Sequence, residues 1–203
     1  MASSKNRLSK NGFSVSFDSP VTLILVLAFI LVAILQRFLP SFAWLFVCPC
    51  KSGNVAAFDY TKVADYFRIF LYPFGFANWN QMTANLVFIL LLCPRVEQTF
   101  GRLFTFILVL LTVVFAGVIC VCFSNSVIYG TSGIVCMLLI LAIYVSIDKK
   151  QIPLSYILLT VIYFAREIIS IIDTNTVEVF CHFAGSLAGS LVGILSLSFG
   201  GKK

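Results

Sequence analysis

Residues 129–134 read YGTSGI and residues 181–189 read CHFAGSLAG, and each stretch lies at the start of a long apolar segment. The first holds Ser132 between two glycines, and the second holds His182, the one histidine of the chain. A serine hydroxyl becomes a nucleophile when a nearby base takes its proton, and imidazole is the usual base. We therefore interpret Ser132 and His182 as a candidate catalytic pair, provided that the fold brings the two segments together.

The composition of the chain predicts an integral membrane protein. Of its 203 residues, 60% are hydrophobic and 11% are charged, and the mean hydropathy is +1.03. A soluble domain would carry about twice that share of charge. A bilayer core about 30 Å thick needs roughly 20 apolar residues per spanning helix. We therefore expect an all-α, polytopic bundle of six transmembrane helices, at residues 21–39, 79–93, 103–123, 130–147, 153–172 and 177–199.

The N-terminal segment and the longest connection are less apolar than the predicted spans. Residues 1–18 are polar and rich in serine, and we expect them to be a disordered cytosolic tail ahead of one membrane domain at residues 19–203. The long connection at residues 40–78 alternates aromatic side chains with a few charges. Such a segment is expected to lie in the membrane interface rather than to form an aqueous domain.

The net charge of +6 reflects membrane topology rather than nucleic-acid binding. Nine basic residues fall in the tail, the second and fourth connections and the C-terminus, against four on the opposite face. By the positive-inside rule this bias places both termini in the cytosol. The organelle stays open: the secretory pathway or plasma membrane is favoured, but a basic, serine-rich start also fits a mitochondrial transit peptide.

Metal and cofactor chemistry is not expected. Most of the seven cysteines lie in apolar segments, where a thiol is usually a small packing residue. A single histidine and the lack of any metal-ligand spacing argue against a zinc site.

Glycines at a four-residue period follow the histidine. Gly185, Gly189 and Gly193 leave one helix face without side chains, which lets membrane helices approach closely. With the N-terminus inside, the helices that carry Ser132 and His182 both begin on the outer side, so the two residues share one depth. We expect this glycine face to press the last helix against the helix of Ser132.

Taken together, these motifs resemble the rhomboid family of intramembrane serine proteases, over residues 68–193. Each motif is weak alone, but five in the family's order are specific. They are the GxSG at residues 130–133, the HxxGxxxG from His182 to Gly189, the second-helix Asn85, the ExxxG from Glu97 to Gly101, and the aromatic–arginine pair Phe67-Arg68.

The resemblance implies a six-helix rhomboid fold and a Ser132–His182 dyad that hydrolyses peptide bonds in or near transmembrane segments. It implies that Asn85 and the Ser132 backbone amide stabilise the oxyanion. Substrates would be single-span membrane proteins that enter from the lipid bilayer. Gln81 stands where the family usually has a histidine that also helps to bind the oxyanion. A glutamine amide still donates a hydrogen bond. Cys136 stands where an aromatic side chain usually packs on the histidine ring.

These two departures leave an alternative open, a non-catalytic rhomboid-like protein that binds membrane clients. Two acidic residues also have alternatives. Glu178, one turn before His182, is expected to form a capping box with Asn175, although a catalytic triad with His182 is the other reading. Glu97, expected in a loop after the second helix, is predicted to pair with a basic neighbour.

Overall fold

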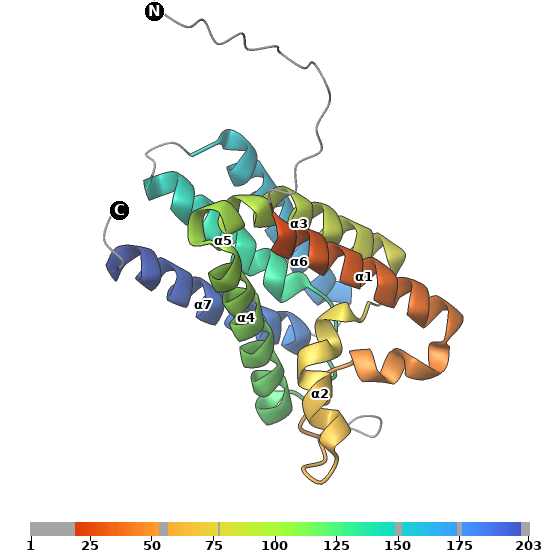
Figure 1. Ribbon diagram of the computed structural model, residues 1–203. Coiled ribbons are helices and arrows are strands. Elements are labelled where there is room, and N and C mark those ends of the chain that lie inside the picture. The colour runs from red at the N-terminus through yellow and green to blue at the C-terminus, as the bar shows by residue number, and fades with distance from the viewer. Residues whose placement is uncertain (1–18, 53–56, 77, 149–151, 174–175, 200–203) are drawn as a thin grey trace, which may run out of the picture.

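The computed structural model describes residues 19–52, 57–76, 78–148, 152–173 and 176–199. Helices make up almost all of the ordered structure in these ranges (Figure 1). Their bounds are α1 Pro20–Phe38, η1 Pro40–Phe46, α2 Val63–Leu71, η2 Tyr72–Phe74, α3 Trp79–Phe100, α4 Arg102–Phe123, α5 Ser132–Asp148, α6 Leu154–Asp173 and α7 Thr176–Phe199, of which the two η elements are 3-10 helices. The predicted all-α class is confirmed.

Fewer of the described helices than predicted are long and apolar enough to cross a membrane. By length and hydropathy, three helices among the described residues are able to cross a bilayer: Pro20–Phe38, Arg102–Phe123 and Val179–Ser196. The pair Val63–Phe74 and Trp79–Phe100, bent by 78°, would add a fourth. The shorter Ser132–Ile147 is apolar too. Several apolar helices are therefore present, but the predicted count of six spans is not confirmed.

The centre of the bundle is α5, which crosses the middle of the view in Figure 1. Residues 134–139 are buried around its whole circumference, with exposed fractions of 4% or less. A helix that is apolar on every side lies either inside protein or in lipid, and here other helices enclose it. Helices α3, α4 and α7 supply that enclosure. The first residue of α5 is Ser132, so the core of the protein positions the candidate nucleophile.

The third helix is longer than predicted. Five of the predicted helices match the structure within two residues at each end, but α3 continues from Trp79 through Pro94 to Phe100 instead of ending at residue 93. Gly101 ends it with φ of 82°, a left-handed backbone that favours glycine. Glu97 therefore lies in a helix and not in a loop.

Glu97 caps the start of α1 rather than pairing with a basic residue, so that prediction was wrong. Its carboxylate oxygens accept hydrogen bonds from the backbone amides of Val21 and Thr22 and from the Thr22 hydroxyl, each 3.0 Å long. The first amides of a helix have no partner within the helix, and the helix dipole favours a negative charge beside them. A buried carboxylate from α3 thus joins α1 to the bundle.

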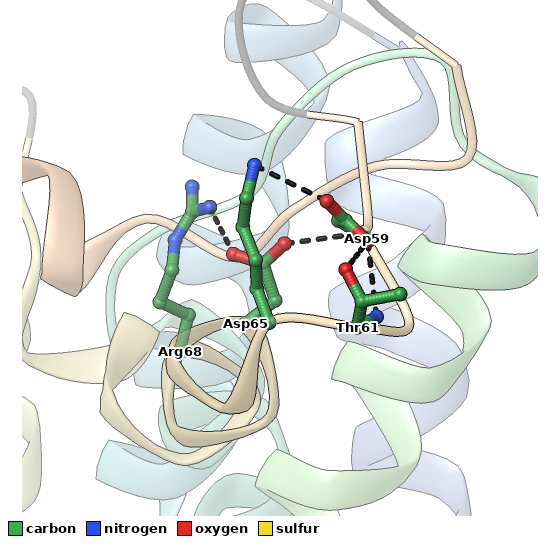
Figure 2. A network of polar contacts seen from close by, with 5 residues as sticks. Asp59, Thr61, Asp65 and Arg68 are labelled. Atoms are coloured by element: carbon green, nitrogen blue, oxygen red, sulfur yellow. Dashed lines mark hydrogen bonds and ion pairs between the residues drawn. The ribbon is translucent and has the colours of Figure 1, made fainter.

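The connection at residues 40–78 folds around a buried ion pair between Asp65 and Arg68 on α2, 2.8 Å long. Arg68 also donates from Nε to the carbonyl of Val47 at 2.9 Å and lies over the Trp44 ring at 5.5 Å. Figure 2 shows Asp65 between Arg68 and the backbone amide of Asp59, which donates to its second oxygen at 2.9 Å. One arginine thus links η1, α2 and the loop before α2.

The same network continues to the surface at Asp59. Hydrogen bonds from the hydroxyl and backbone amide of Thr61 lower the pKa of the Asp59 carboxyl to about 2. Phe67 and Phe70 on α2 are exposed, which suits an apolar surrounding. The predicted place of this connection in the membrane interface stays a prediction.

The glycine face of α7 packs mainly against α4, and the predicted partner α5 meets only part of it. A Cβ added at Gly185 would lie 2.5 Å from the Cβ of Ala116 and 2.6 Å from the carbonyl oxygen of Thr112. One added at Gly189 would overlap the Thr112 hydroxyl. Towards α5, a Cβ at Gly189 would lie 3.3 Å from Met137 Cγ, and one at Gly193 would lie 2.7 Å from Leu141. The two backbones approach so closely because α7 lacks side chains here.

Candidate active site

Ser132 lies at the turn that begins α5. Gly130 has φ of 92°, a conformation that side chains rarely adopt, and its amide donates to the carbonyl of Tyr72 at 3.0 Å. This bond ties the turn to η2. Ser132 itself is buried, with 3% of its surface exposed. Because it is the first residue of the helix, its backbone amide belongs to the group that has no acceptor within the helix.

His182 lies in the second turn of α7 and is also buried, with 4% exposed. Its Nε2 atom lies 3.2 Å from the carbonyl oxygen of Tyr129, in the turn before Ser132. Gly133 meets the same residue, since an added Cβ there would lie 3.2 Å from His182 Nδ1. The imidazole therefore packs directly on the start of α5, where a side chain at position 133 would crowd it.

Ser132 and His182 line one cavity of about 280 Å³ between α5, α6 and α7. Its walls are mostly apolar and aromatic, but Glu167 on α6 also borders it. The structure thus brings together the two residues that the sequence paired. A nucleophile and an imidazole that line one largely apolar cavity are suited to general-base catalysis.

The two predicted oxyanion residues lie on the other side of the Ser132 turn. Asn85 and Gln81, on α3, line a second and smaller cavity whose wall includes Gly130 and Thr131. Asn85 is buried with 2% exposed, whereas Gln81 is half-buried. They are therefore neighbours of the turn that carries Ser132, but they do not line the cavity that it shares with His182.

Three side chains around the site were not singled out from the sequence as site residues. The Tyr163 hydroxyl on α6 donates to the carbonyl of Ser132 at 2.7 Å. The Tyr72 ring lies 6.0 Å from the His182 ring, so an aromatic neighbour comes from η2 although position 136 is a cysteine. Arg166 on α6 donates from Nη1 to the Asn85 amide oxygen at 3.0 Å.

The signals for these residues differ. An arginine in an apolar segment marks a functional site by default, so Arg166 was open to detection. Tyr163 lies three residues earlier and hence on the same helix face. Nothing local distinguishes Tyr72 from the many aromatic residues around it.

Two other expectations are not settled. Asn175 and the Glu178 side chain lie outside the described residues, so neither the capping box nor the triad is tested.

In the ranges that the structure describes, no group of three or more histidine, cysteine, aspartate or glutamate side chains gathers to hold a metal ion. No metal role is therefore assigned to any residue of the site.

The chain matches a known protein family. The family model for the Rhomboid domain matches residues 63–199, which is more than half of the chain and runs from α2 to the end of α7. The matched region contains all four predicted site residues. No curated protein matches the chain.

Proposed function

This chain belongs to the rhomboid family, and we propose that it is an active intramembrane serine endopeptidase. The observation that carries the proposal is the cavity that Ser132 and His182 share. Both residues are buried, both line one cavity, and the imidazole packs on the first turn of the serine's helix. The substrates are membrane proteins with a single transmembrane segment, cleaved within that segment or just outside it.

The reaction follows the two-step scheme of acyl transfer. Ser132 Oγ attacks the carbonyl carbon of the scissile peptide bond while His182 takes the hydroxyl proton. As the tetrahedral intermediate collapses, the C–N bond breaks and His182 returns the proton to the leaving amine. A water molecule, activated by the same imidazole, then hydrolyses the acyl-enzyme. The cavity beside Ser132 provides space for substrate and water.

The oxyanion of each intermediate needs donors aimed at it. The Ser132 backbone amide is suited to this role because it begins α5 and has no acceptor within the helix. Asn85 and Gln81 approach from α3, across Gly130 and Thr131. Each such donor contributes about 10²–10³ in rate in serine proteases.

The proposed topology has six spans, with both termini in the cytosol and the active site towards the outer side. The nine-to-four bias of basic residues supports this orientation. The same topology makes residues 1–18 a cytosolic tail and places residues 40–78 in the interface. The secretory pathway or the plasma membrane is the favoured location, with mitochondria as the alternative.

A second function has an observation in its favour. Gln81 and Asn85 line a different cavity from Ser132 and His182. Gln81 also departs from the family's usual histidine. If those donors do not reach the oxyanion, the protein binds membrane clients without cleaving them.

The experiment that separates the two functions uses the full chain in proteoliposomes with a fluorogenic single-span substrate. Ser132→Ala and His182→Ala should each reduce cleavage to background, because loss of either residue costs about 10⁶ in kcat in a serine protease. Ser196→Ala is the matched control, since its hydroxyl bonds only the nearby Gly193 carbonyl at 2.7 Å. A folded wild type that retains the substrate but never cleaves it would establish the client-binding function instead.

A further inference from the structure

Arg166 is a charged residue inside an otherwise apolar stretch of α6. Its neighbours Ile162 and Ile169 are each 60% exposed, as expected of residues that face lipid, whereas Arg166 is half-buried. Placing an arginine at such a position is costly, and in membrane helices charged side chains nearly always turn towards protein. Its Nη1 atom donates to the Asn85 amide oxygen on α3, 81 residues away in sequence, at 3.0 Å.

This bond fixes which end of the Asn85 amide is available. A guanidinium group has five N–H donors and no acceptor, so the oxygen of the amide must face Arg166. The amide nitrogen of Asn85 is then the end left to donate elsewhere. Asn85 borders the cavity next to Gly130 and Thr131, immediately before Ser132. Without Arg166, either end of the amide could face that cavity.

The same face of α6 also holds the nucleophile's turn. Tyr163 donates to the Ser132 carbonyl at 2.7 Å and packs edge-on against Phe88 of α3, with ring centroids 5.6 Å apart. Tyr163 and Arg166 are three residues apart and so lie on one helix face. Through these two residues α6 contacts both the serine turn and the α3 residue expected to stabilise the oxyanion.

Charge supports the same role. In a low-dielectric site, a positive group behind an amide polarises it and strengthens its N–H donors. Arg166 is such a positive group, 3.0 Å from the Asn85 amide oxygen. Glu167, the next residue, borders the separate cavity of Ser132 and His182.

We propose that Arg166 is a positioning residue: it orients Asn85 so that the amide nitrogen donates to the oxyanion. This inference rests on the proposed protease function. Arg166 does not touch the reacting atoms itself and acts through Asn85. Two other roles would use the same hydrogen bond, a latch that closes the gap between α3 and α6 against substrate entry, and a purely structural tie.

The test measures kcat, KM and thermal unfolding on six variants of the full chain. Arg166→Met should lower kcat by about 10²–10³, the usual loss for one oxyanion donor, while KM changes by less than about threefold. Arg166→Lys, which keeps one donor and the charge, should recover part of the rate. Asn85→Ala should match Arg166→Met, and the double variant should be no slower than Asn85→Ala. Arg102→Met, an exposed arginine at the start of α4, is the control and should keep the wild-type rate.

Asn85→Asp separates orientation from stability. Aspartate still accepts from Arg166 but has no N–H to donate, so kcat should fall by at least about 10² while the unfolding temperature is maintained or rises. If Arg166→Met does not fold, Arg166→Lys and Asn85→Asp decide the question alone.

Each contrary result has its own meaning. A full-rate Arg166→Met or Asn85→Asp enzyme overturns the positioning role and leaves the protease function standing. A gain in kcat/KM for Arg166→Met identifies the latch, and a double variant slower than Asn85→Ala shows that Arg166 acts independently of Asn85. A folded wild type without Ser132-dependent cleavage overturns the proposed function, and this inference with it.

Discussion

Replacing Gly185 by alanine tests how α7 holds His182 in place. The added Cβ would lie 2.5 Å from the Ala116 Cβ and 2.6 Å from the Thr112 carbonyl oxygen. Carbon atoms normally pack about 3.5–4.0 Å apart, so α7 must retreat from α4 by roughly 1 Å. Both contacts involve backbone or Cβ atoms that no rotamer change can move. We expect a loss of about 1–3 kcal/mol in the free energy of unfolding, as for other overpacked cores.

Activity should fall together with stability, because His182 lies one turn before Gly185. A displacement of about 1 Å at a catalytic group costs about 10²-fold in rate. Unfolding in detergent and kcat for a single-span substrate would be measured on Gly185→Ala and on Leu191→Val. Leu191 is 56% exposed on the same helix and serves as the control, with a change of less than about 0.5 kcal/mol. A Gly185→Ala protein with wild-type stability and rate would refute the close contact between α7 and α4.

Two further predictions concern α3. If the Gln81 amide donates to the oxyanion, Gln81→Ala should lower kcat at least about tenfold with little change in KM, and Gln81→His should keep or raise the rate. A destabilised Gln81→Ala enzyme with full kcat would show that the residue only ties helices. Glu97→Gln should lower the free energy of unfolding by about 1–3 kcal/mol, because the amide NH₂ group would face a backbone N–H of α1. Gln98→Ala, an exposed neighbour, is the control for thermal unfolding, and equal melting temperatures for both variants would contradict the capping role of Glu97.

The candidate site illustrates how far sequence reasoning reached. Ser132 and His182 were paired because of their motifs and because both of their helices were predicted to begin on the outer side of the membrane. The structure places the two residues on one cavity. Asn85 and Gln81 were predicted to stabilise the oxyanion, and this role stays a prediction. The structure places them beside the serine turn, on a cavity that was not foreseen. A one-dimensional motif identifies which residue types are present, whereas the side of a turn that each one reaches depends on how α3 and α5 pack.

Glu97 and the glycine face show the same limit more sharply. The sequence marked Glu97 as a residue of interest but assigned it to a loop after a helix that was expected to end at residue 93. The helix continues, and the carboxylate reaches the α1 amides from 75 residues away. The glycine period predicted a close helix contact correctly, yet it carried no information about which helix would fill it.

The sequence alone determined the properties that depend on local chemistry. Hydropathy established a helical membrane protein, and the lengths of the apolar runs placed five helices within two residues, because a backbone in lipid must satisfy its own hydrogen bonds. Only the tertiary structure decided the partners: Arg166 with Asn85, Tyr72 with His182, and α7 with α4. These contacts join residues far apart in the chain, and packing of shapes and charges selects them among many helix faces of similar apolar composition.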